Sequence, residues 1–167
     1  KPVDKKLLLD ALTKGLRDRE RALDLQMARM VFEVANEGIL VTDSEPRIIA
    51  VNPAFSVITG YRPDEVIGQK TNVLSSGLHD ADFYRSMWNT LETHGRWSGE
   101  ITNRRKNGEP FAEWLSIAAV EGKFQGVQRY VGLISDISER KKEEELIRRL
   151  AHFDSLTGLP NRVLFND

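Results

Sequence analysis

The stretch that decides the fold runs from residue 96 to residue 136 and reads RWSGEITNRRKNGEPFAEWLSIAAVEGKFQGVQRYVGLISD. In its first part, residues 96–106, successive side chains point to opposite sides of an extended chain, so that Trp97 and Asn103 fall on the same side. Asn107-Gly108 is a strong hairpin signal, because both residue types tolerate a positive φ. The stretch therefore predicts three successive antiparallel strands, at 96–106, 110–120 and 127–136.

Two shorter strands precede this stretch, at 38–43 and 47–51, and a turn containing Asp and Pro separates them. Asn52-Pro53 is expected to begin a short helix, with Asn as N-cap and Pro at the first helical position. A second helix is expected over 80–93, with Gly95 ending it. Two strands, several helices and three strands predict an α+β fold, with a five-stranded antiparallel sheet and helices on one face.

Both ends of the chain predict helices. Over residues 1–30, a stripe with a spacing of three and four positions is formed by Leu9, Leu12, Leu16, Leu23 and Met30, and the polar residues Arg19 and Gln26 complete it. This stripe has two interpretations, a parallel coiled-coil dimer that carries a signal or an amphipathic helix packed on its own domain. Residues 136–152 predict a second helix, with Asp136 and Glu139 as its capping box.

Composition excludes several classes of function. The chain has 24 basic and 25 acidic residues, which gives no reason to expect a nucleic-acid partner. It has no cysteine, so disulfides and thiolate metal sites are excluded within it, and the three histidines lack metal-ligand spacing. We expect no metal site and no catalytic residue, since no nucleophile–base–orienter set is visible.

Six short pieces of the chain, taken in order, resemble a PAS sensory domain. They are Glu37–Ile39, Val51–Phe55, Thr59–Tyr61, Glu65–Gly68, Arg104–Glu109 and Gly132–Arg140. The resemblance implies a PAS fold over 31–138 whose concave sheet face and helices enclose a pocket. It also implies flanking signalling helices, at 1–30 and, as a linker, at 139–152. On this resemblance Asp136 and Ser138 are expected to transmit the signal, because they lie where the last strand meets the output helix.

The last stretch, 153–167, resembles the start of a GGDEF domain, the family of diguanylate cyclases that make cyclic di-GMP. The resemblance rests on Asp154–Arg162, which reads DSLTGLPNR. It implies that the chain is a fragment that is not itself an enzyme and that the full-length protein is a diguanylate cyclase. Whether a phosphodiesterase domain follows is left open.

These resemblances predict a sensory and dimerisation module that regulates an attached GGDEF domain in bacterial signal transduction. The expected partners are a second copy of the chain, the GGDEF domain and a small-molecule ligand. A ligand-free interaction module and a flavin-binding redox sensor are the alternatives. With no apolar run of about 18 residues, we expect a cytoplasmic domain, and a membrane anchor upstream of residue 1 is left open.

The ligand pocket is expected to involve Trp97, Asn103 and Glu113. Light-oxygen-voltage domains are flavin-binding PAS domains that need an adduct-forming cysteine, which this chain lacks. In the resemblance to them, Asn103 falls on a flavin-bonding Asn. Glu113 replaces a second Asn, and Ile134 replaces a Gln. FAD or another flavin is therefore an alternative to the favoured expectation of no cofactor, with Trp97 packing on the ring.

Two further inferences concern single side chains. Haem is disfavoured, because haem PAS domains carry a proximal His near the end of the central helix. His79 precedes that helix, and His94 lies at its C-terminus, where a His commonly interacts with the helix dipole. Glu113 is the unusual inward-facing carboxylate, and we expect either a ligand contact or an internal ion pair with Arg104 or Arg105. Trp114, the next residue, is expected to face the opposite side.

Overall fold

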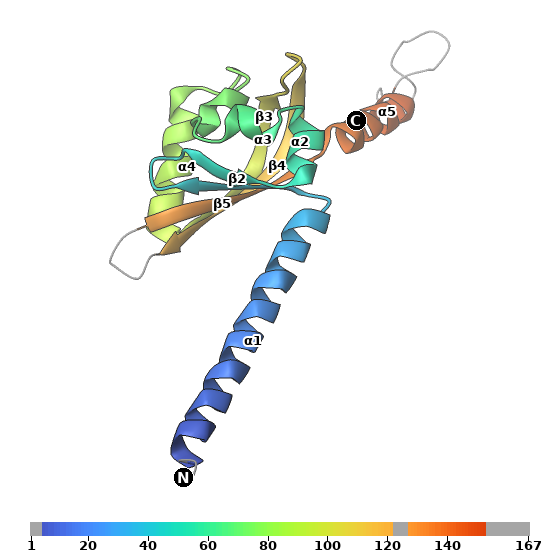
Figure 1. Ribbon diagram of the computed structural model, residues 1–167. Helices are drawn as coiled ribbons and strands as arrows, with labels where there is room; N and C mark the ends of the chain where they lie inside the picture. The colour runs from blue at the N-terminus through green and yellow to red at the C-terminus, as the bar shows by residue number, and fades with distance from the viewer. Residues whose placement is uncertain (1–4, 122–126, 153–167) are drawn as a thin grey trace.

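The computed structural model describes residues 5–121 and 127–152 (Figure 1). Helices and strands follow in the order α1 (Lys5–Val34), β1 (Gly38–Asp43), β2 (Ile48–Val51), α2 (Pro53–Thr59), α3 (Pro63–Val66), the 3-10 helix η1 (Thr71–Leu74), α4 (Ala81–His94), β3 (Arg96–Arg104), β4 (Pro110–Glu121), β5 (Val127–Asp136) and α5 (Ser138–His152). One antiparallel sheet has the strand order β2-β1-β5-β4-β3. The predicted α+β class and the five-stranded antiparallel sheet are confirmed.

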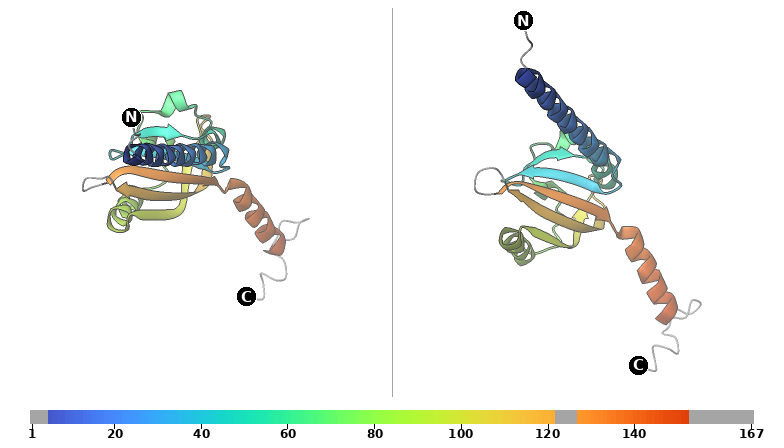
Figure 2. Two further views of the ribbon diagram at one scale, coloured as in Figure 1. Left: turned by 60° about the horizontal axis from the view of Figure 1, so that its bottom comes forward. Right: turned by 90° about the horizontal axis from the view of Figure 1, so that it is seen from below.

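The crossover helices lie on one face of this sheet, as the sequence predicted (Figures 1 and 2). Asn52 caps α2 by accepting a hydrogen bond from the Phe55 amide, and Gly60 ends the helix with a φ of 78°. Asp80 caps α4 in the same way, through the Phe83 amide. The core between helices and sheet is built on fully buried side chains, among them Ile48, Phe55, Phe111 and Ile134.

The hairpin between β3 and β4 forms at the predicted place with a different turn. The Gly108 amide donates to the Arg105 carbonyl, and the Arg105 amide donates to the Glu109 carbonyl. Gly108 has a φ of 89°, whereas Asn107 is not among the residues with positive φ. This is the three-residue loop that ends in a left-handed glycine, so of the two residues expected to tolerate a positive φ only Gly108 adopts one.

Helix α1 extends from the domain as a single long rod (Figures 1 and 2). It ends at Val34, four residues after the predicted end at residue 30. Leu23 and Met30, both on the predicted apolar stripe, remain 53% and 55% exposed. An amphipathic helix packed on its own domain would bury these side chains, so that interpretation is wrong for this part of the stripe.

Helix α5 follows the C-terminal end of β5, which lies beside the start of β1 where α1 ends, and it also projects from the sheet (Figure 2). It begins at Ser138, two residues after the predicted start. The Asp136 carboxylate accepts from the Ser138 amide rather than from the Glu139 amide, so the predicted capping box is replaced by a shorter contact. Residues 153–167, which were expected to begin a GGDEF domain, lie outside the described residues.

Candidate ligand cavity and helix junction

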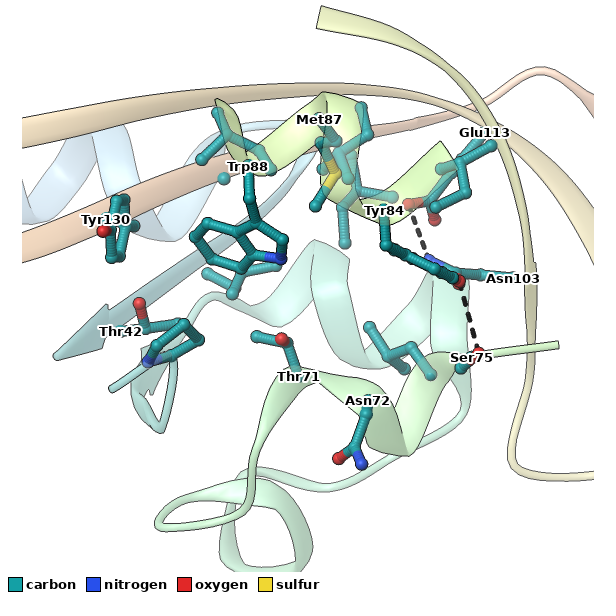
Figure 3. A pocket seen from close by; sticks show the side chains of 18 residues that line it. Thr42, Thr71, Asn72, Ser75, Tyr84, Met87, Trp88, Asn103, Glu113 and Tyr130 are labelled. Carbon is teal, nitrogen blue, oxygen red and sulfur yellow. Dashed lines mark hydrogen bonds between the residues drawn. The ribbon is translucent and has the colours of Figure 1, made fainter. Parts of the chain in front are cut away.

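A cavity of about 330 Å³ lies between the concave face of the sheet and the helical segment 71–88 (Figure 3). Its walls come from β1, β3, β4 and β5, from η1 and from α4. Most of the wall is apolar, with Leu40, Leu115 and Ile134 contributed by the sheet. Pockets of this size and character are typical of sites for small organic molecules.

Asn103 and Glu113 lie together in this cavity, as Figure 3 shows. The Asn103 amide Nδ2 donates to Glu113 Oε1 at 3.0 Å. Glu113 is 0% exposed and Asn103 7%, which makes the contact one between two buried side chains. The second carboxyl oxygen, Oε2, has no hydrogen-bond partner among the described residues. Residues ten positions apart in the sequence therefore share one polar end of an otherwise apolar cavity.

The surroundings of Glu113 favour its neutral form. Burial raises the pKa of Glu113 from 4.5 to about 8, and the hydrogen bond from Asn103 opposes this only in part. The ion pair predicted with Arg104 or Arg105 does not form. Arg104 donates to the Ser76 and Gly108 carbonyls, and Arg105 pairs with Asp136. Both guanidinium groups are thus engaged elsewhere.

Three aromatic side chains also line the cavity, two from helix α4 and one from the sheet. Tyr84 and Trp88 project from α4, and Tyr130 from β5 (Figure 3). The Tyr84 hydroxyl lies 3.3 Å from Ser75 Oγ, and the Trp88 and Tyr130 rings meet edge to face at 5.4 Å. The sequence analysis missed these residues, although Tyr84 and Trp88 stand four positions apart on a predicted helix and so share one face.

Trp97 does not line this cavity. Its ring packs edge to face on Phe83, with centroids 6.1 Å apart, and covers the backbone of Gly99. Trp97 and Asn103 lie on the same side of β3 as predicted, but six residues of strand place them about 20 Å apart. The structure thus brings Asn103 and Glu113 together and leaves Trp97 in a separate aromatic contact. Trp114 faces the other side of the sheet, as predicted, and is exposed.

Asp136 and Ser138 form the junction between β5 and α5. Arg105 Nη2 donates to Asp136 Oδ2 at 2.6 Å, and the Ser138 amide donates to Oδ1 at 2.9 Å. The Ala112 amide donates to Ser138 Oγ at 3.1 Å, which ties the first turn of α5 to β4. Burial alone would raise the pKa of Asp136, but hydrogen bonds from Arg105 and Ser138 outweigh it and lower that pKa below its ordinary value.

Strand β5 joins the cavity to this junction. Tyr130, Gly132 and Ile134 line the cavity at alternate positions, and Asp136 continues the same series. Because alternate residues of a strand share one face, Asp136, two residues after the last cavity contact at Ile134, lies on that face and bonds the start of α5. The cavity wall at Ile134 is thus only two residues from Asp136, which bonds the start of α5.

This combination of a curved sheet, an internal cavity and projecting helices defines a small sensory domain. The chain belongs to the PAS domain family, whose model matches residues 36–139. It is a PAS sensory domain of the kind found in signalling proteins, among them the relative described next.

A nitrogen fixation regulatory protein of Klebsiella oxytoca is 30% identical over 133 residues, which cover 80% of this chain and 26% of that protein. The chain thus spans about a quarter of the length of this relative. The PAS domain of a protein from Colwellia psychrerythraea is 26% identical with a TM-score of 0.64, covering 70% of this chain and 98% of that one. An RNA-binding light-oxygen-voltage receptor, at 24% identity and a TM-score of 0.68, covers 78% of this chain and 38% of its own and shares the fold.

Residues 5–121 and 127–152 contain neither a candidate metal site nor a candidate membrane span. No cluster of three or more His, Cys, Asp or Glu side chains is arranged to hold a metal ion there. In the same residues no helix has the length and apolar character needed to cross a membrane. Within the described residues, the cavity and the β5–α5 junction are the candidate functional features.

Proposed function

We propose that this chain is a sensory and dimerisation module that reports occupancy of its cavity to an attached GGDEF domain. The observation that carries the proposal is the continuity of β5. Alternate β5 residues line the cavity up to Ile134, and the next one, Asp136, bonds the first turn of α5. A ligand that shifts β5 changes the geometry of the start of α5, because the cavity-lining residues and Asp136 belong to the same rigid strand.

The Arg105–Asp136 pair gives this junction a second connection. Arg105 stands in the β3–β4 loop, its guanidinium lies 4.3 Å from the centroid of the Phe111 ring, and it donates to the Ile58 carbonyl of α2. Asp136 therefore links α5 to β4, to the hairpin loop and, through Arg105, to α2. Movement of the wall around the cavity is expected to reach α5 by these contacts as well as along β5.

The GGDEF output is supported by the Asp154–Arg162 motif, which follows α5 directly in the sequence. A helix that emerges from the sensor and runs into the start of the next domain can transmit a rotation or a change in helix register. Dimerisation is supported by the exposed apolar stripe of α1, which is suited to a second copy of the same helix.

Flavin binding is the second candidate, and the fold shared with a light-oxygen-voltage receptor favours it. The polar groups of the cavity do not fit a flavin ring well. Asn103 already donates to Glu113, a carboxyl stands where an amide was expected, and fully buried Ile134 offers no polar atom. We therefore expect purified protein to be colourless between about 350 and 500 nm. Flavin released from the protein on heating would make flavin binding the favoured function.

The test uses the natural protein extended beyond Asp167 through the whole GGDEF domain. Thr71 lines the cavity, and Thr71→Phe would fill part of it as a ligand would. We expect this change to alter the rate of cyclic di-GMP synthesis several-fold. Asp136→Ala in the same protein should abolish that response, because it detaches α5 from the strand. Unchanged synthesis in a folded Thr71→Phe protein would contradict the proposal.

A further inference from the structure

The charge of the cavity wall restricts the chemistry of its ligand. The ionisable side chains that line it are Glu113, Tyr84 and Tyr130, and none of the described lining residues is Lys, Arg or His. An anionic ligand would therefore lose its water without gaining a counter-charge, and it would meet a carboxyl group. The wall is complementary to a ligand that donates hydrogen bonds and carries no negative charge.

The geometry of Glu113 shows where such a ligand would bind. Asn103 holds Oε1, which fixes the orientation of the carboxyl plane and leaves Oε2 free of any partner among the described residues. Glu113 is completely buried and lies in the cavity wall. A buried carboxyl oxygen without a partner is costly, and when Glu113 is ionised Oε2 can accept a full hydrogen bond from a ligand N–H.

The aromatic side chains point to a cation rather than to a neutral donor. Tyr84, Trp88 and Tyr130 line the same cavity as Glu113, and Tyr84 and Trp88 both project from α4 (Figure 3). The faces of such rings attract organic cations, most strongly where water is excluded. Apolar side chains on the sheet, such as Leu115, would contact the body of the ligand.

We propose that the cavity binds a small organic amine in its protonated form, with the ammonium group donating to Glu113 Oε2 and the apolar body among the aromatic side chains. This inference rests on the proposed function, because it names the ligand class of the same cavity. It distinguishes this domain from one that senses a carboxylate, a phosphate or a flavin.

Binding of a cation would be coupled to loss of a proton from Glu113. Without a ligand, burial raises the pKa of Glu113 to about 8. The groups that face it are Asn103 from β3, Tyr84 from α4, Asp136 from β5 and Arg105 from the hairpin loop. An ammonium ion favours the carboxylate form, so the affinity for an amine should rise as the pH approaches 8. For a single coupled carboxyl the increase is about fiftyfold between pH 6 and pH 8.

The probes are 2-phenylethylamine, 2-phenylethanol and phenylacetate, which carry the same ring with a cationic, a neutral and an anionic group. Dissociation constants measured by calorimetry at pH 6, 7 and 8 should show binding of the amine, at least tenfold weaker binding of the alcohol and none of phenylacetate. Glu113→Gln keeps an oxygen that can accept from Asn103 but has no charge. It should remove both the preference for the amine and the dependence on pH, without weakening binding of the alcohol.

Several results would overturn the inference. Binding of the alcohol as tight as that of the amine would do so, as would an affinity for the amine that does not change between pH 6 and pH 8. Absence of binding by the whole set of propylamine, 2-phenylethylamine and tryptamine to folded protein would also overturn it.

A failure of the proposed function gives a different pattern. If Thr71→Phe alters cyclic di-GMP synthesis while no amine binds, the inference about the ligand is wrong and the sensory function stands. If the amine binds as described while hydrogen exchange at the start of α5 does not change, the inference about the ligand holds and the proposed transmission is wrong.

Discussion

Glu113 and Asp136 are direct partners across β4 and β5, yet their carboxyl groups have opposite electrostatic surroundings. Asp136 receives hydrogen bonds from the Arg105 guanidinium and the Ser138 amide, which together lower its pKa. Glu113 has one neutral amide, and burial raises its pKa. The pair thus places an ionised carboxylate, Asp136, at the helix junction beside a neutral carboxyl, Glu113, in the cavity.

Glu113→Gln should change how stability depends on pH. The folded pKa of Glu113, about 8, lies above the value of 4.5 expected of the unfolded chain. The protonated carboxyl therefore contributes fully below pH 4.5, and its contribution is lost as the pH rises toward 8. Relative to Glu113→Gln, the wild type should lose on the order of 4 kcal/mol of unfolding free energy between pH 5 and pH 8. Urea unfolding at pH 5, 6.5 and 8 measures this.

The matched control for this experiment is Glu92→Gln, since Glu92 lies exposed on α4. Its unfolding free energy should follow that of the wild type across the same pH range. Parallel curves for wild type and Glu113→Gln would show that Glu113 is ionised inside the fold, against the assignment made here.

Asp136 should stabilise the first turn of α5 through its charge and its oxygen acceptors. Asp136→Ala removes both contacts and should cost about 1–2 kcal/mol. Asp136→Asn keeps an acceptor for the Ser138 amide and loses the charge that pairs with Arg105, so about half of that cost is expected. Because the folded pKa of Asp136 is lowered, its contribution is present at neutral pH and is lost as the pH falls below about 3.9 toward the folded value.

Amide hydrogen exchange distinguishes the two Asp136 variants locally. The amides of Ser138 and Lys141 should exchange faster in Asp136→Ala than in Asp136→Asn, since only the former leaves the Ser138 amide without its acceptor. Equal exchange rates in both variants and the wild type would mean that Asp136 does not hold the helix start.

Asn52 should be among the most sensitive polar positions of the domain. Its buried side chain accepts from the Phe55 and Ile39 amides and donates to the Glu37 carbonyl. Asn52→Ala leaves these buried groups without partners and should cost about 3 kcal/mol. Asn52→Ser retains the cap of α2 alone and should recover about 1 kcal/mol of that loss. Thermal unfolding of both variants tests this, and a cost for Asn52→Ala no larger than that of an ordinary exposed cap would contradict it.

The α1 stripe should hold a dimer. Leu23 and Leu25 are both exposed, but only Leu23 lies on the stripe of three-and-four spacing. Leu23→Glu should weaken dimerisation at least tenfold by placing a charge in the seam, whereas Leu25→Glu should leave it unchanged. Light scattering at micromolar concentrations measures the mass. A wild-type chain that stays monomeric, or two variants that behave alike, would contradict a parallel coiled coil through α1.

Local signals determined much of this fold. Asn52-Pro53, Asp80 and Gly95 act through hydrogen bonds and φ values within a few residues, so the ends of α2 and α4 could be read directly. The hairpin at Asn107-Gly108 was placed correctly, but the dipeptide did not predict its turn type. Whether one residue or two take a positive φ depends on how the strands pair, which the dipeptide alone does not specify.

The cavity required the tertiary structure. Alternation assigned Trp97 and Asn103 to the same side of one strand, and the resemblance to flavin-binding domains placed Glu113 in the pocket, so all three were expected there. The strands are longer than the cavity, so Trp97 meets Phe83 instead, while Tyr84 and Trp88 enter the wall from α4. Which inward residues share a cavity is decided by where the helices cross the sheet.

The sequence by itself thus determined the order of the strands along the chain and the common side of Trp97 and Asn103, because these follow from short-range geometry and alternation. The PAS fold and the inward direction of Glu113 were predicted from the family resemblance. Only the tertiary structure decided the charge states of Glu113 and Asp136. Arg105 reaches Asp136 across 31 residues of sequence and leaves Glu113 to a neutral amide. The partners that set a buried carboxyl's ionisation come from distant parts of the chain, and folding alone brings them together.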